Sequence, residues 1–161
     1  MNPRLDPLHT TLNLNARLFL SALGGVTDDV ATTRPNSNTN HMAFIACHLL
    51  DARHYLAEYT GLATDKPFKD ILEGAKGIED IATFPALANI LSEWKAISER
   101  LSEHLPKLEE WTLTADSPQS FPVEDKTVLG GITFLLEHES HHIGQLAYLR
   151  RYFAMPPLDW F

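Results

Sequence analysis

Four long stretches in which apolar residues recur every three or four positions constrain the fold of this chain more than any other feature of its sequence. The clearest covers residues 83–105, whose apolar side chains share one side of a helix: Leu87, Ile90, Leu91, Trp94, Ile97, Leu101 and Leu105. Comparable patterns predict helices over residues 7–23, 38–60 and 128–153. No segment between them alternates with a period of two for long enough to form a sheet, so the sequence predicts an all-α four-helix bundle.

Capping and helix-breaking residues set the expected ends of these helices. Ser37 or Asn38 is expected to cap the second helix, since both side chains can accept a hydrogen bond from a free backbone N–H. Pro85 suits the first turn of the third helix, and Pro106 stops it. Three connecting stretches remain: residues 27–39 and 114–125 as loops, and residues 61–82 with a short helix at 68–72.

Composition limits the class of protein. With 161 residues, of which 44% are hydrophobic, the chain is expected to form one domain over residues 1–161. A net charge of -8 without a cluster of Lys or Arg argues against a nucleic-acid partner. We expect the protein to be located in the reducing cytoplasm, because it has a single cysteine, Cys47, and no apolar segment near the N-terminus. No apolar stretch reaches the roughly 18 to 20 residues that span a bilayer, so no membrane partner is expected.

Histidines supply the strongest indication of chemistry. His138 and His142 stand four residues apart, so both rings project from one face of the fourth helix, on the flank of its apolar side. His48 lies on the corresponding flank of the second helix. We therefore predict a divalent metal site formed by His48, His138 and His142, with coordination positions left open. The alternative is a set of structural histidines bonded to backbone or water.

The other histidines are expected to play no part in this site. His41, one heptad before His48, is a reserve ligand. We expect the rest to be solvated: His9, His54, His104 and His141.

Two residues beside the predicted ligands are candidates for catalysis. Glu139 falls near the centre of the apolar side of its helix, where it can act as a general base, orient a ligand histidine, or form a buried ion pair with an arginine. Gln145 lies on the ligand side and can donate a hydrogen bond to a substrate, or remain a solvated amide. Cys47 faces away from the apolar stripe and is expected to be structural.

Two other metal sites fit the sequence less well. Residues 138–142 match the H-E-x-x-H pattern of zinc proteases, with Glu139 as the general base. The chain after His142 contains no further His or Glu, however, and no strand is predicted to align a peptide. A di-iron carboxylate centre needs a glutamate from each of two helices and a Glu-x-x-His pair from each of the others, but the first helix has no acidic residue between Leu8 and Gly25.

Two segments carry a resemblance to a known family. HLLDARHYLAEYTG, which begins at His48, and HESHHIGQLAYLRRY, which begins at His138, resemble the two signature helices of the DinB/YfiT-like superfamily. The resemblance implies an up-down-down-up four-helix bundle, usually dimeric. Three imidazoles also suit iron, so iron is a further candidate for the ion. The resemblance itself implies a nickel, zinc or related divalent ion held by one histidine of the second helix and two of the fourth. These would be His48, His138 and His142.

The resemblance also implies a class of function. Some relatives transfer small thiols such as bacillithiol, mycothiol or glutathione. The chain is therefore expected to be a metal-dependent enzyme, first a thiol S-transferase acting on a small molecule and second a hydrolase using metal-bound water. The alternative is a non-catalytic module that binds or senses metal. A stripe of small residues, Ser140, Gly144 and Ala147, is a candidate contact for the homodimer.

Overall fold

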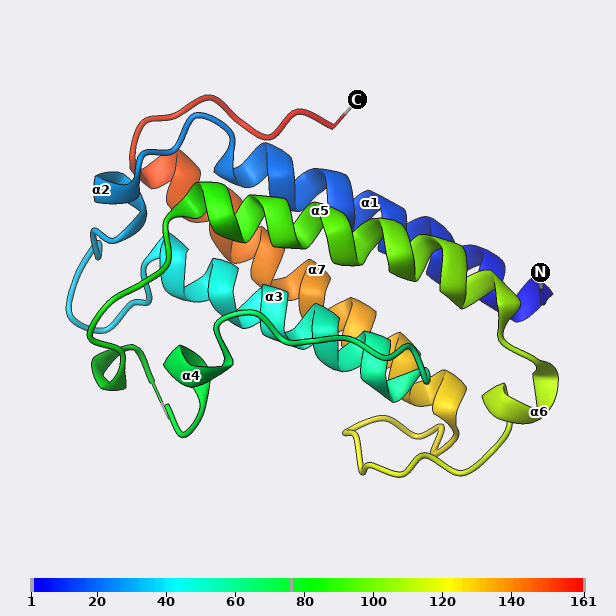
Figure 1. The fold of residues 1–161 in the computed structure, drawn as a ribbon. Helices are drawn as coiled ribbons and strands as arrows, with labels where there is room; N and C mark the ends of the chain where they lie inside the picture. The colour runs from blue at the N-terminus through cyan, green and yellow to red at the C-terminus, as the bar shows by residue number, and fades with distance from the viewer. Residues whose placement is uncertain (1, 76, 161) are drawn as a thin grey trace.

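The computed structural model describes residues 2–75 and 77–160, and helices account for its regular structure (Figure 1). The four long helices are α1 (Asp6–Leu23), α3 (Met42–Tyr59), α5 (Leu87–His104) and α7 (Val128–Tyr152). The short ones are η1 (Pro3–Leu5), α2 (Asp28–Ala31), α4 (Lys69–Leu72), η2 (Ile78–Asp80), η3 (Leu105–Lys107) and α6 (Glu110–Leu113). Within the described residues, the only pairing of the β type is an isolated bridge between Asp116 and Thr127. The prediction of an all-α fold is confirmed.

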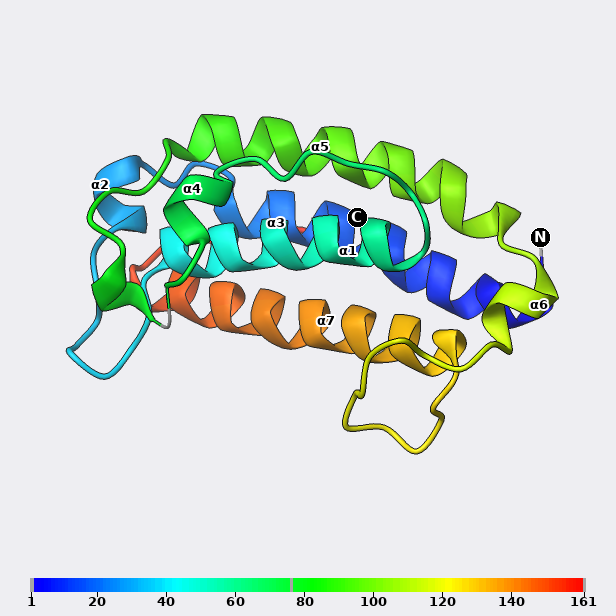
Figure 2. The ribbon, with the colours of Figure 1, turned by 60° about the horizontal axis from the view of Figure 1, so that its bottom comes forward.

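The long helices pack as a four-cornered bundle. Helix α1 contacts α7 and α5, and α3 contacts the same two helices. Figures 1 and 2 show that α1 and α7 run in one direction and that α3 and α5 run in the other. The contacts agree with this arrangement, since His9 of α1 meets Ser102 of α5, whereas Ala16 further along α1 meets Trp94 nearer the start of α5. Along the chain the long helices therefore run up, down, down and up.

The apolar stripes of the four helices meet in one core. Trp94 lies at its centre, fully buried, and its ring stacks on Phe19 with centroids 3.9 Å apart. The indole N–H of Trp94 donates to the carbonyl of Ala16 at 3.1 Å, so burying this large ring leaves no unpaired donor. Other fully buried residues of the core are Leu12, Leu49, Leu56, Ile90, Ile132 and Leu146.

Two long helices begin later than the sequence predicted. Helix α3 begins at Met42, because the Nδ1 atom of His41 accepts a hydrogen bond from the backbone N–H of Phe44 at 3.0 Å and thereby caps it. Helix α5 begins at Leu87, whose backbone N–H donates to the Asp28 carboxylate at 2.8 Å. The predictions that Ser37 or Asn38 caps the second helix, and that the third begins near Thr83, are wrong.

The connections also differ in part from the prediction. Residues 27–39, predicted as a loop, contain helix α2, which Thr27 caps by accepting a hydrogen bond from Val30. Helix α4 confirms the short helix predicted at residues 68–72. Helix α7 ends at Tyr152, one residue before the predicted limit. None of the helices in the described residues is both long and apolar enough to cross a membrane.

Candidate metal centre

Three imidazoles converge between α3 and α7. The Nε2 atom of His138 lies 3.1 Å from Nε2 of His48 and 3.1 Å from Nε2 of His142. The three ligand atoms lie within 4.8 Å of one another. Two nitrogens bound to one ion at about 2.1 Å are about 3.0 Å apart at a right angle and about 3.4 Å apart at a tetrahedral angle. The spacing of the imidazoles therefore matches that of ligands on a single metal ion.

Regular helix geometry brings these rings together. His138 and His142 are one turn apart on α7, so their rings lie on one face and meet edge to face, with centroids 4.5 Å apart. His48 approaches from α3, and its ring centroid lies 4.9 Å from that of His138 and 4.7 Å from that of His142. All three side chains are half-buried, so the centre lies where the core meets the surface.

Electrostatics keep the three rings neutral. Burial lowers the pKa of His48 to about 4, and the neighbouring His142 and His138 add to this effect. Burial is also the main cause that lowers the pKa of His138 and of His142. Because a metal binds the neutral imidazole, these rings present lone pairs at neutral pH without first losing a proton.

Gln145 fixes the tautomer of His142. Its amide oxygen lies 2.7 Å from Nδ1 of His142 and can only accept, so Nδ1 carries the proton and Nε2 holds the lone pair that faces the other imidazoles. The amide nitrogen of Gln145 lies 3.2 Å from Nε2 of His141. The structure thus gives Gln145 a contact with His142 that sequence reasoning missed. Its hydrogen bond to a substrate stays a prediction.

A cleft adjoins this side of the centre. Its volume is about 550 Å³, within the range of small-molecule sites, and it separates the loop at residues 35–40 from α7. Gln145, His141 and Gly144 line it together with the exposed ring of Tyr148. The cleft therefore reaches the residues that flank His142.

A smaller recess of about 130 Å³ opens on His48 from the other side. Phe44 and Asp51 of α3 line it, and Leu72, Ala75 and Ile81 of the connecting segment close it. The Asp51 carboxylate forms an ion pair with Lys66 at 3.4 Å. Sequence reasoning missed Asp51 as a neighbour of the centre, although its position three residues after His48 places the two on the same side of a helix.

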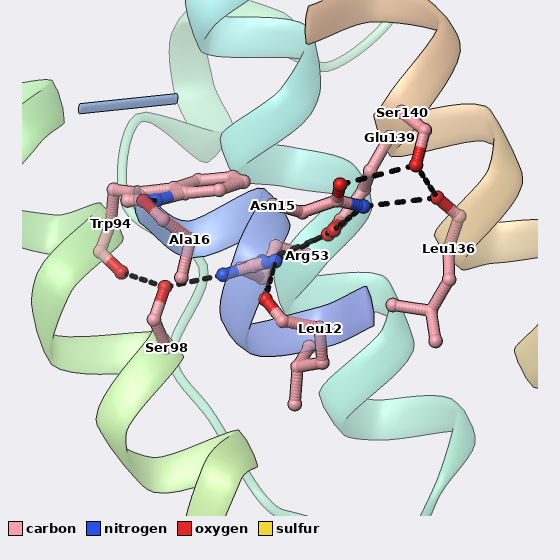
Figure 3. A network of polar contacts seen from close by, with 9 residues as sticks. All are labelled: Leu12, Asn15, Ala16, Arg53, Trp94, Ser98, Leu136, Glu139 and Ser140. Carbon is pink, nitrogen blue, oxygen red and sulfur yellow. Dashed lines mark hydrogen bonds and ion pairs between the residues drawn. The ribbon is translucent and has the colours of Figure 1, made fainter. Parts of the chain in front are cut away.

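Glu139 lies in the core and pairs with Arg53 (Figure 3). Its side chain is 1% exposed, and the guanidinium of Arg53 donates to both carboxylate oxygens, from Nε at 2.8 Å and from Nη2 at 2.6 Å. Among the described residues, the Glu139 carboxylate accepts hydrogen bonds from Arg53 and Asn15 and not from the three imidazoles. Of the roles expected from the sequence, the structure shows the buried ion pair with an arginine. Catalysis by Glu139 stays a prediction.

The remaining histidines lie outside the centre. His41, the reserve ligand, caps α3 and packs edge-on against Phe84. His141 is exposed, as predicted. His9 and His104 are half-buried and bonded to the carbonyls of Ser102 and Thr60, so the prediction that they are solvated is wrong.

His54 is also buried, contrary to the prediction that it is solvated. It is 3% exposed, and its Nδ1 atom lies 2.7 Å from the hydroxyl oxygen of Thr64. Its Nε2 atom is buried without a hydrogen-bond partner among the described residues. Burial lowers the pKa of His54 to about 4, so this ring is neutral in the folded protein.

Acid should therefore destabilise the metal-free protein partly through His54. The pKa of His54 is about 4 in the folded state against 6.5 for a histidine of the unfolded chain, so between these values the unfolded chain binds the extra proton. The stabilisation is complete above about pH 6.5 and is lost as the pH falls towards 4. We expect the His54→Asn variant to lose less stability over this range than the parent, as measured by urea unfolding at several pH values. The exposed His141→Asn variant is the control, and equal losses in His54→Asn and parent would contradict the prediction.

The fold and the site together define an all-α bundle with a cluster of three histidines that could hold a metal ion. Comparison of the sequence with protein families identifies the bundle further, because the profile of the DinB superfamily matches residues 11–146. The chain belongs to the DinB superfamily. The matched range includes His48, His138 and His142. No curated protein matches the chain significantly.

Proposed function

We propose that this protein is a metal-dependent enzyme that transfers a low-molecular-weight thiol to a small molecule, with His48, His138 and His142 as the metal ligands. The observation that carries the proposal is the convergence of three neutral imidazoles, with the His138 Nε2 atom 3.1 Å from each of the other two. Membership of the DinB superfamily supports it. Nickel or zinc is the proposed ion, with iron as a further candidate, because imidazole nitrogens suit all three.

Three neutral ligands suit this chemistry. His48, His138 and His142 would hold the divalent ion, and because these ligands are uncharged the bound ion would favour the thiolate form of a small thiol at neutral pH. Other residues of the chain would orient the ligands, give room for the substrate and accept a proton. Gln145 orients His142 through the Nδ1 proton, and the cleft of about 550 Å³ beside it gives room for a small substrate. Asp51, which lines the recess at His48, is the carboxylate that we propose takes up the released proton.

The homodimer is also a proposal. Gly144 is exposed on α7, and a methyl group added there would meet no atom within 4 Å. The fold itself therefore gives no reason for a glycine, which costs about 1 kcal/mol in a helix. Ser140 does not belong to the same surface, because its hydroxyl donates to Asn15 of α1. A dimer contact would centre on Gly144, at the edge of the cleft that His141 and Gln145 also line, and not on the whole stripe of small residues.

An assay with defined metal content tests the proposed function. Protein loaded with zinc or nickel should transfer glutathione or another small thiol to an aryl halide, and a chelator should abolish the activity. His142→Ala should be inactive, whereas His9→Ala, which removes an imidazole outside both the cluster and the cleft, should keep the activity of the parent. Hydrolysis of an ester without thiol transfer would favour a hydrolase. Metal binding with neither reaction would favour a non-catalytic module.

A further inference from the structure

The buried ion pair between Arg53 and Glu139 joins all four long helices (Figure 3). Arg53 of α3 binds Glu139 of α7 through two hydrogen bonds. Its Nη1 atom donates to the hydroxyl of Ser98 of α5 at 2.6 Å, and its Nη2 atom donates to the carbonyl of Leu12 of α1 at 3.2 Å. The guanidinium also lies 3.9 Å above the ring of Trp94. One side chain therefore contacts the other three helices.

Asn15 of α1 extends the network along α7. Its amide nitrogen donates to the carbonyl of Leu136 at 3.1 Å and lies 3.4 Å from the Glu139 carboxylate, and its amide oxygen accepts from Ser140 at 3.1 Å. Asn15 is thus hydrogen-bonded to two polar side chains and one backbone carbonyl of α7. The side chains of Arg53 and Glu139 are 0% and 1% exposed, so the ion pair is fully buried. Its charged groups are hydrogen-bonded to each other and to groups of α1 and α5.

Stability alone does not account for such a pair. Desolvation of two charges offsets most of their attraction, and well-packed apolar side chains of similar volume often stabilise a core equally well or better. Loss of one partner is costly, however, because the other charge is then buried alone. The network consequently favours the single arrangement of helices in which the two charges meet.

The apolar stripe of α7 does not select that arrangement by itself. Leu135 and Ile143 lie one turn before and one turn after Glu139, and both are buried in the same core. A slip of α7 by one turn, about 5.4 Å, would exchange one apolar side chain for another along the stripe. The same slip would place Glu139 away from Arg53. It would also leave only one of His138 and His142 beside His48, because these two stand one turn apart, so the three Nε2 atoms could no longer share an ion.

We propose that Arg53 and Glu139 are positioning residues for the metal centre, which set the register of α7 against α3 so that His48 meets His138 and His142. The inference rests on the proposed metal site. Glu139 is adjacent to His138 in sequence, and Arg53 stands five residues after His48 on α3. Each helix therefore carries one member of the ion pair within about two turns of its metal ligands.

Replacement of the whole pair by apolar side chains tests this role. The Arg53→Met/Glu139→Leu variant should remain helical and unfold cooperatively, because no charge is left unpaired. We expect its affinity for zinc to fall at least tenfold, as measured by competition with a chelator, and its cobalt spectrum to differ from that of the parent. Arg53→Leu/Glu139→Met offers a second apolar packing if the first variant does not fold.

A destabilised control separates positioning from general loss of stability. Leu101→Ala removes buried volume from α5, which holds none of the ligands, and should leave the zinc affinity and the cobalt spectrum unchanged. Zinc affinity within twofold of the parent in a folded double variant would overturn the positioning role and leave the proposed function intact. A parent protein that binds no metal would overturn both.

Discussion

Removal of His138 and His142 together should abolish metal binding. The parent is expected to hold about one equivalent of a divalent ion per chain, and His138→Ala/His142→Ala is expected to hold none after the same purification. The loss of affinity should exceed about a thousandfold, since loss of even an outer-shell partner costs roughly 10–100-fold. Elemental analysis of protein prepared without an affinity tag measures the metal content. Circular dichroism should show the same helix content in both proteins, because neither ring is part of the central core.

The matched control removes two histidines outside the cluster. His9→Ala/His104→Ala changes the same number of imidazoles, but neither residue belongs to the group of three. It should therefore keep the metal content of the parent. Equal metal in the parent and in His138→Ala/His142→Ala would place the ion elsewhere. Absence of metal from the reconstituted parent would make the three histidines structural and remove the basis of the proposed enzyme.

The parts of the site that follow from regular helix geometry were predictable from the sequence. His138 and His142 share a face of α7 because four residues make about one turn, and His48 lies on the flank of α3 that meets it. Both arguments need only the period of a helix and the side on which its apolar residues lie. The sequence therefore predicted which three rings come together before any contact was known.

Contacts between distant segments were not predictable in the same way. Asp28 determines where α5 begins, although it lies 59 residues before Leu87. His54 is buried because the segment after α3 returns over that helix and places Thr64 against its ring. Periodicity within α3 assigned His54 to the solvent side, since it takes no account of chain outside the helix. Local patterns thus describe each helix but not the loops that cover it.

The ion pair between Arg53 and Glu139 was predictable from one of its two helices only. Glu139 lies near the centre of the apolar side of α7, where a carboxylate needs a buried partner. An ion pair with an arginine was one of the roles predicted for it. The apolar stripe of α3 did not single out Arg53, although its side chain is 0% exposed. Burial of an arginine depends on the carboxylate, hydroxyl and carbonyl groups that other helices bring to it.

Loss of the Arg53 charge alone should be among the most destabilising single substitutions in the chain. Arg53→Met keeps the length of the aliphatic stem but leaves the Glu139 carboxylate, 1% exposed, without its cation. We expect the free energy of unfolding to fall by about 3–5 kcal/mol, a large part of the roughly 5–15 kcal/mol that stabilises a typical domain. Urea unfolding of the metal-free protein at neutral pH, followed by circular dichroism, measures the difference.

Arg4→Met is the matched control, because it breaks the ion pair between Arg4 and Glu110 on the surface. Those side chains are 55% and 54% exposed and 3.2 Å apart, so water replaces the lost partner and the expected cost is about 0–1 kcal/mol. The same chemical change should therefore have very different effects at the two sites. An equally small cost for Arg53→Met would mean that Glu139 is readily neutralised or hydrated in the core. The ion pair would then exert too little force to hold α7 in register with α3, and the metal ligands would owe their alignment to the apolar stripes alone.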